Sequence, residues 1–246
     1  MSEPLAVVLA AGKGTRMKSD LPKVLVEVCE RPMIEYVLDA LAAGGVRRIV
    51  VVVGYRAELV RDALHDRPAV EFVLQTEQLG TGHAVMASRE VLEGHDGPVL
   101  VVTGDSPMMR AESVEALLAE FDRHDAACIL GTAHRKDADG LGRIRRDAEG
   151  HFLGIVEEKD CTPQQRLITE VNMSYYVFDC RELLQSLGHI RDDNAQGEYY
   201  VTDCPGVLIA QGKDVRALDV LDPVESLGVN TIEEIAVVEA AMRGGL

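Results

Sequence analysis

A glycine-rich loop is the segment of this sequence best suited to chemistry. It follows a short apolar run and reads Leu9-Ala10-Ala11-Gly12-Lys13-Gly14-Thr15-Arg16-Met17. Glycines such as Gly12 and Gly14 let backbone N–H groups approach phosphate oxygens closely, because no Cβ intervenes. Arg16 and, a few residues later, Lys23 can add a guanidinium fork and a point charge to a bound polyphosphate. The loop therefore indicates a site for a phosphorylated ligand.

The spacing of these glycines excludes two better-known phosphate motifs. Both the dinucleotide-binding pattern Gly-x-Gly-x-x-Gly and the P-loop pattern require a glycine at position 17, where this chain has Met17. A lone Gly-x-Gly is a weak signal, and an ordinary strand-to-helix turn explains it equally well. The surrounding elements and the other polar segments must therefore decide between the two interpretations.

Strands and helices alternate around the loop through the first half of the chain. Continuous apolar runs predict buried strands over 6–10, 47–54, 70–75 and 98–104. Amphipathic stretches predict helices over 32–43, 57–64, 82–92 and 111–124. This alternation predicts an α/β fold with a doubly wound, mostly parallel sheet. In such a fold the loop lies at the carboxyl edge of the sheet, where ligands bind.

The second half of the chain follows another pattern. Residues 142–145 and 152–156 predict a β-hairpin with its turn at Glu149-Gly150. A further strand is predicted over 171–178 and a closing helix over 231–242. The chain has no Pro/Ser-rich linker, so we expect a single domain over 1–246 in which the hairpin adds a substrate-facing lobe to the same sheet.

Composition excludes several classes of function. Hydrophobic residues make up 47% of the 246, which excludes a disordered chain, and no apolar run is long enough to span a bilayer. The net charge of −16 argues against binding to nucleic acid or to an anionic membrane. No positively charged segment precedes the first strand, so we expect a cytoplasmic protein. The five cysteines form no Cys-x-x-Cys pair and are expected to be reduced thiols.

Six further segments follow the loop in a fixed order, and the set of seven resembles the sugar nucleotidyltransferases. They are Gln75–Ala84, Gly104-Asp105, Gly142-Arg143-Ile144, Val156–Asp160, Asn194–Asp203 and Gly228-Val229-Asn230. Together they look like the uridylyltransferase domain of bacterial UDP-N-acetylglucosamine pyrophosphorylases, and the resemblance covers essentially the whole chain. It implies a Rossmann-like fold and attack by a sugar-1-phosphate oxygen on the α-phosphorus of UTP. The expected products are pyrophosphate and a UDP-sugar, namely UDP-N-acetylglucosamine.

The resemblance also assigns roles to individual residues. It implies that Arg16 and Lys23 are catalytic and that Asp105 and Asn230 hold Mg²⁺, with phosphate oxygens and water completing its coordination. The implied substrate contacts are Leu9, Ala11, Gly12, Gly14, Gln75, Gly80, Thr81, Thr103, Gly142, Glu157 and Asn172. Of these, Gln75, Gly80 and Thr81 would read the uracil, and Gly142, Glu157 and Asn172 would contact the amino sugar. Residues 1–131 then form the nucleotide-binding half, 132–229 the sugar-binding half, and 230–246 the C-terminal helix.

The chain departs from the family pattern at three places. Thr103 stands where the family usually has an aromatic residue, and Met173-Ser174 replaces the usual Thr-Gly beside Asn172. The third departure is the end of the chain at Leu246, without hexapeptide repeats, so we expect the acetyltransferase β-helix domain to be absent and the oligomeric state stays open. The first two changes leave the identity of the sugar open.

Two alternatives to this function remain. The same fold could serve another sugar-1-phosphate or another nucleotide, as in a cytidylyl or molybdopterin-type transfer. A different class would be a catalytically silent sensor that binds a sugar nucleotide and regulates a partner. The combination of Arg16, Lys23, Asp105 and Asn230 favours the enzyme, because binding alone does not require that set of charges and metal ligands.

Overall fold

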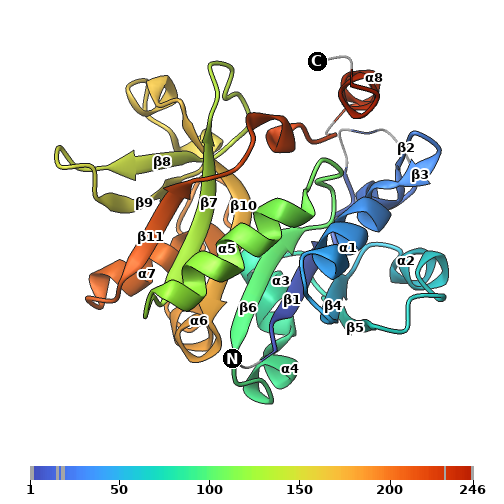
Figure 1. Cartoon of the computed structure of the whole chain (residues 1–246), viewed down its shortest axis with the longest axis horizontal. Helices are drawn as coiled ribbons and strands as arrows, with labels where there is room; N and C mark the ends of the chain where they lie inside the picture. The colour runs from blue at the N-terminus through green and yellow to red at the C-terminus, as the bar shows by residue number, and fades with distance from the viewer. Residues whose placement is uncertain (1–2, 15–16, 18–19, 230, 245–246) are drawn as a thin grey trace.

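A nine-stranded sheet with helices on both faces forms the centre of the computed structural model (Figure 1). The structure describes residues 3–14, 17, 20–229 and 231–244. The strand order along the sheet is β11-β7-β10-β6-β1-β4-β5, and β8 pairs with both β10 and β9. The strands are β1 (Leu5–Ala10), β4 (Arg48–Val53), β5 (Val70–Leu74), β6 (Pro98–Thr103), β7 (Cys128–His134), β8 (Arg143–Arg146), β9 (Phe152–Val156), β10 (Glu170–Asp179) and β11 (Val215–Asp219).

Strand β1 lies in the middle of the parallel part of this sheet. It pairs in parallel with β4 and with β6, and β5 continues the sheet beside β4. Because all four strands run in the same direction, the loops that follow them meet at one edge. Both faces of β1 are covered, which explains why its sequence is apolar at every position rather than at alternate ones.

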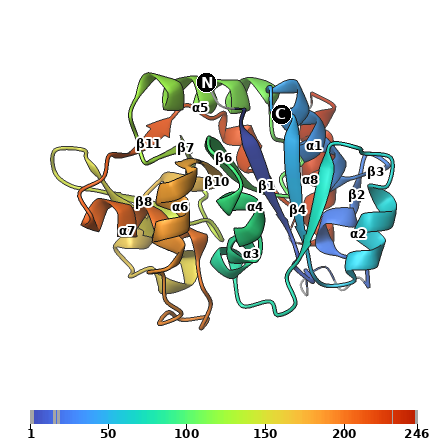
Figure 2. The ribbon, with the colours of Figure 1, turned by 90° about the horizontal axis from the view of Figure 1, so that it is seen from below.

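Two layers of helices cover the two faces, as Figure 2 shows. One layer contains α1 (Met33–Ala43), α2 (Ala57–Ala63) and α5 (Ala111–Arg123). The other contains α3 (Thr81–Ala87), α4 (Arg89–Glu93), α6 (Cys180–Leu187) and α7 (Cys204–Ala210). The predicted doubly wound, mostly parallel sheet is therefore confirmed. No helix among the described residues combines the length and apolar character that crossing a membrane requires.

Strand β10 runs against its neighbours. It is antiparallel to β6 on one side and to β7 on the other, and its first residues also pair with the β8–β9 hairpin. The register with β7 shifts between Asn172 and Tyr175, and inside this bulge Ser174 has a φ of +58°. The predicted hairpin is present, and its turn is closed by a hydrogen bond from the N–H of Gly150 to the carbonyl of Asp147.

A small apolar cluster joins three segments that are remote in the sequence. It contains Met17 of the glycine-rich loop, Val26 and Val28 beside the short β2–β3 pair (Glu27–Val28 and Arg31–Pro32), and Val229. Helix α8 (Ile232–Met242) contributes Val238, and Glu239 of this helix accepts a hydrogen bond from the N–H of Cys29 at 2.9 Å. The closing helix thus packs against the segments that flank the loop.

Sequence reasoning missed some elements and merged others. The helix predicted over 82–92 is two short helices, α3 and α4, which meet at the buried Ser88. Strands β7 and β11 and helices α6 and α7 were not predicted. The thiols of all five cysteines are free, as expected.

Candidate active site

Three neighbouring cavities lie where the carboxyl ends of β1 and β6 meet the hairpin lobe. The largest is about 260 Å³, and the predicted residues that line it are Leu9, Ala11, Gly12, Lys23, Gln75, Gly80, Thr81, Thr103 and Asp105. A second, of about 200 Å³, is bordered by Lys23, Thr103, Asp105, Asn172, Met173 and Ser174, among others. The smallest, about 40 Å³, lies against Glu157, Ser174, Tyr176 and Thr202. Thr103 borders all three cavities, so the residues predicted for the nucleotide and for the sugar meet at this position.

Lys23 and Asp105 form an ion pair in the wall shared by the two larger cavities. Nζ of Lys23 lies 2.5 Å from Oδ2 of Asp105, and the side chains are 18% and 25% exposed. Burial by itself raises the pKa of the Asp105 carboxyl, but the Lys23 ammonium and hydrogen bonding outweigh it and hold the pKa below its usual value. The site therefore holds a carboxylate and an amino group side by side.

Gly14 shapes the approach of Lys23 to the loop. Its φ is +63°, and a Cβ at this position would lie 2.7 Å from Cβ of Lys23. In the described part of the chain, Gly14 does not line any of the three cavities. Its role in this structure is to let the aliphatic part of the Lys23 side chain pack against the loop. Lys13 of the same loop lies over the ring of Tyr55, with its Nζ 5.3 Å from the ring centre.

Gln75 lies at the end of β5 and is 3% exposed. Its Nε2 donates to the carbonyl of Gly80 at 3.1 Å and lies 3.0 Å from Nδ1 of His83. These contacts fix the amide plane in the cavity wall, where an amide offers a donor and an acceptor to the edge of a pyrimidine. His83 was not among the predicted residues, although it occurs in the same motif as Gln75.

The segment 198–201 docks onto the loop that contains Gly80. Tyr199 donates its N–H to the carbonyl of Leu79 and accepts the N–H of Gly82 at 2.7 Å, while Val201 donates to Oγ1 of Thr81. A Cβ at Gly80 would lie 2.5 Å from the carbonyl oxygen of Tyr199. Glycine at 80 therefore permits the contact between the two motifs, and this contact brings Glu198 into the wall of the 260 Å³ cavity. Glu198 was not among the residues predicted to contact a substrate.

The wall predicted for the sugar comes from β9, β10 and the turn before α7. Oε1 of Glu157 accepts a hydrogen bond from Oγ1 of Thr202 at 2.9 Å. Burial raises the pKa of Glu157 despite this bond, and the nearby carboxylates of Asp203, Asp160 and Glu198 raise it further. A half-buried carboxylate of this kind can accept a hydrogen bond from a hydroxyl group.

Asn172 is held by hydrogen bonds within its own strand. Its Nδ2 donates to the hydroxyl of Tyr176 at 2.6 Å, and its Oδ1 accepts the N–H of Ser174 at 3.1 Å. Gly142 lines none of the three cavities among the described residues, but its carbonyl accepts the N–H of Asn172 at 2.9 Å. Gly142 therefore helps to position Asn172 through this backbone hydrogen bond.

Ser174 occupies the position where a glycine was expected. Its φ of +58° lies in the left-handed region, which suits glycine and costs other residues about 1–2 kcal/mol. The backbone thus keeps the conformation that a glycine would adopt, and the serine side chain adds volume at the junction of the two smaller cavities. At Thr103 the hydroxyl lies 2.9 Å from Oγ of Ser106.

The residues around Asp105 fit a hard divalent cation. The Asp105 carboxylate borders both larger cavities, and a carboxylate oxygen is the kind of ligand that Mg²⁺ prefers. Gly228 borders the same cavity as Asp105, and a Cβ there would lie 3.9 Å from the carbonyl oxygen of Asp105. The segment that precedes Asn230 in the sequence therefore faces Asp105. Arg16 and Asn230 themselves lie outside the described residues.

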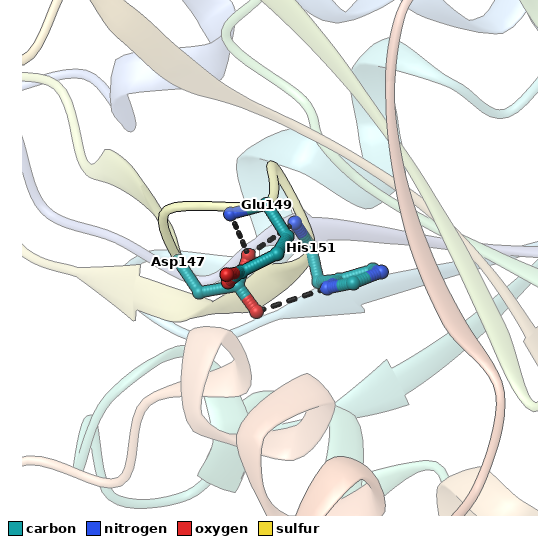
Figure 3. A group of neighbouring side chains, drawn as sticks. All are labelled: Asp147, Glu149 and His151. Carbon is teal, nitrogen blue, oxygen red and sulfur yellow. Dashed lines mark hydrogen bonds and ion pairs between the residues drawn. The ribbon is translucent and has the colours of Figure 1, made fainter.

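Another cluster of possible metal ligands occurs at the tip of the β8–β9 hairpin (Figure 3). Among the described residues it is the one group of three such side chains, Asp147, Glu149 and His151. Oδ1 of Asp147 accepts the N–H groups of Glu149 and His151, and Oδ2 lies 2.9 Å from Nδ1 of His151. These bonds stabilise the turn and explain the cluster without a metal ion.

Comparison with known proteins places the chain in a family. Residues 6–200 match the model of the MobA-like NTP transferase domain. The chain belongs to this family. Within it, the chain is 45% identical over 243 residues to the bifunctional protein GlmU of Brevibacillus brevis, a match that covers 99% of the chain and 52% of that relative. Its identity to the bifunctional protein GlmU of Pelotomaculum thermopropionicum is 46% over 239 residues, or 97% of the chain and 52% of the relative. The chain spans about half the length of the curated relatives it matches.

A solved structure has the same fold as this chain. The crystal structure of UDP-glucose pyrophosphorylase complexed with UDP-glucose superposes with a TM-score of 0.78 and covers 100% of both chains. The sequence identity is 16%, so the likeness concerns the fold alone. The predicted Rossmann-like nucleotidyltransferase fold is confirmed by this match and by the family model.

Proposed function

We propose that this chain is a uridylyltransferase that forms UDP-N-acetylglucosamine and pyrophosphate from UTP and N-acetylglucosamine-1-phosphate. The observation that carries the proposal is the Lys23–Asp105 pair, which lies between a cavity lined by the glycine-rich loop and cavities lined by Glu157 and Asn172. An oxygen of the sugar phosphate attacks the α-phosphorus of UTP, and the bond to the departing pyrophosphate breaks. The similarity to the GlmU proteins supports the choice of nucleotide and sugar.

The protein contributes mainly position and charge to this reaction. The backbone N–H groups of the glycine-rich loop and the ammonium of Lys23 bind the triphosphate and stabilise the charge that develops on pyrophosphate. Gln75 orients the uracil, and Glu157 with Asn172 orients the sugar so that the two phosphates meet in line. Asp105, together with Asn230, would hold Mg²⁺, which supplies neutralisation of the phosphate charges when it is bound. Arg16 would add a second cation.

This proposal divides the chain as the sequence suggested. Residues 1–131 hold the nucleotide, 132–229 hold the sugar, and both halves belong to one domain closed by the C-terminal helix. Strand β7 crosses the boundary at residue 131, and the strands of both halves share one sheet, which supports a single folding unit. The proposed partners are UTP and an amino-sugar phosphate, and the proposed location is the cytoplasm.

The test is release of pyrophosphate by the purified protein with Mg²⁺, UTP and a panel of sugar-1-phosphates, with CTP, dTTP and ATP in parallel. Release with UTP and N-acetylglucosamine-1-phosphate, lost in Lys23→Ala, is the expected result. Release with another sugar alone would keep the reaction and change the substrate. Absence of release across the panel, with binding of UDP-N-acetylglucosamine intact, would replace the enzyme by a sensor.

A further inference from the structure

Glu225 is a buried carboxylate on the segment that leads into α8, and it is 3% exposed. Three hydrogen-bond donors converge on it. Oε2 accepts the N–H of Arg110 at 3.0 Å, and Oε1 accepts the hydroxyl of Ser113 at 2.6 Å and the N–H of Asp222 at 3.2 Å. Arg110 and Ser113 belong to the start of α5, more than a hundred positions earlier in the chain. The carboxylate therefore fastens this segment to the first turn of α5.

The three donors require an acceptor at both side-chain oxygens of Glu225. A glutamine would satisfy one side, but its amide nitrogen would face the N–H of either Arg110 or Asp222. One backbone donor would then be buried without an acceptor, which is unfavourable. The exposed ion pair between Arg110 and Asp222, at 2.7 Å, adds little to this attachment because both partners are well solvated.

What Glu225 holds in place is one wall of the candidate metal site. Glu225, Ser226 and Gly228 border the same cavity as Asp105. At the other end of the segment Val229 is fully buried in the small apolar cluster under α8. The chain from 226 to 228 is thus anchored on both sides while it faces Asp105, and Asn230 follows directly in the sequence.

We propose that Glu225, held by Ser113, is a positioning residue that fixes the 226–229 segment opposite Asp105 and thereby sets the affinity of the site for a divalent cation. This role rests on the proposed function, because it assumes that a cation binds at Asp105. Residues that orient metal ligands without touching the ion commonly change its affinity when they are replaced.

The test compares Glu225→Gln and Ser113→Ala with the control Ser186→Ala in the full chain. Ser113→Ala removes one hydroxyl and is the milder change. Ser186 is also a buried helical serine, whose hydroxyl donates to the carbonyl of Leu183, but it lies in α6 and borders none of the three cavities among the described residues. Mn²⁺ is titrated into each protein saturated with UDP-N-acetylglucosamine, and bound Mn²⁺ is followed by electron paramagnetic resonance.

We expect Glu225→Gln to weaken Mn²⁺ binding about 10–100-fold and Ser113→Ala about 3–10-fold, with Ser186→Ala at the wild-type value. In the pyrophosphate assay the Mg²⁺ concentration for half-maximal rate should rise in the same order while the KM for the sugar phosphate stays constant. Equal Mn²⁺ affinity in all folded variants would overturn the positioning role alone. Failure of the wild-type protein to bind Mn²⁺ would overturn the metal site of the proposed function and this role with it.

Discussion

Gly80→Ala tests whether the close approach of the Tyr199 backbone to Gly80 stabilises the wall of the 260 Å³ cavity. Gly80 has φ 109° and ψ 175°, a conformation that is essentially restricted to glycine. An added Cβ would lie 2.5 Å from the carbonyl oxygen and 2.9 Å from the nitrogen of Tyr199. Both atoms belong to the backbone, so no side-chain rotation can relieve the overlap.

The expected cost follows from two contributions. The unfavourable backbone conformation costs about 1–3 kcal/mol for a residue with a Cβ. Moving the segment 198–201 away to make room breaks the two backbone hydrogen bonds of Tyr199, with Leu79 and Gly82, at about 1 kcal/mol each. Gly80→Ala should therefore lower the free energy of unfolding by about 3–5 kcal/mol, a large share of the typical total of about 5–15 kcal/mol.

The assay is urea unfolding followed by circular dichroism, with Gly212→Ala as the matched control. Gly212 also has a positive φ, +76°, but an added Cβ there would meet nothing within 4 Å. In Gly212→Ala the free energy of unfolding should fall only by the conformational cost of about 1–2 kcal/mol. UDP-N-acetylglucosamine binding, measured by calorimetry, should fall in Gly80→Ala and stay constant in Gly212→Ala. Equal losses of stability in the two variants would show that the contact between Tyr199 and Gly80 does not contribute to the free energy of unfolding.

Three further predictions concern charged groups. Lys23→Ala should lower kcat about 10²–10³-fold, because a cation that stabilises the transition state is lost, and near-normal turnover would remove Lys23 from the catalytic set. Glu157→Gln should raise the KM for the sugar phosphate more than that for UTP in steady-state kinetics; the opposite ratio would place Glu157 elsewhere. Burial, with the charges of Asp160 and Asp193, raises the pKa of Asp203 to about 6. Asp203 should therefore contribute a loss of stability as pH rises from about 4 to about 6. Asp203→Asn, followed by urea unfolding across this range, should remove that contribution and add about 1–3 kcal/mol to the free energy of unfolding at pH 7.5.

The proximity of Lys23 and Asp105 at one edge of the sheet could be predicted from the strand order that the sequence indicates. Lys23 and Asp105 follow strands β1 and β6, and parallel neighbours bring their carboxyl ends to one edge, so the meeting of these residues follows from topology. The hairpin β8–β9 could also be predicted from the sequence, since its turn residues lie next to each other in the chain.

Long-range packing decided the features that the sequence did not predict. Strand β7 contains Gly131, which weakens the strand signal, and the structure explains this residue by the side chain of Leu221, which would meet an added Cβ at 2.5 Å. The contact between Tyr199 and Gly80 and the attachment of Glu225 to α5 join segments that are more than a hundred residues apart. Neither leaves a periodic pattern, and a glutamate near a helix start is ordinarily a solvated residue.

The position of β10 has a consequence for synthesis of the chain. Strands β6 and β7 are both complete by residue 134, yet each forms one of its two ladders with β10, which begins at Glu170. While the chain emerges from the ribosome in order, the β10-facing edges of both strands wait unpaired for the strand that will lie between them. A nascent chain that ends between residues 134 and 170 therefore exposes these edges to pairing with other chains, and slow translation over this range would lengthen that exposure.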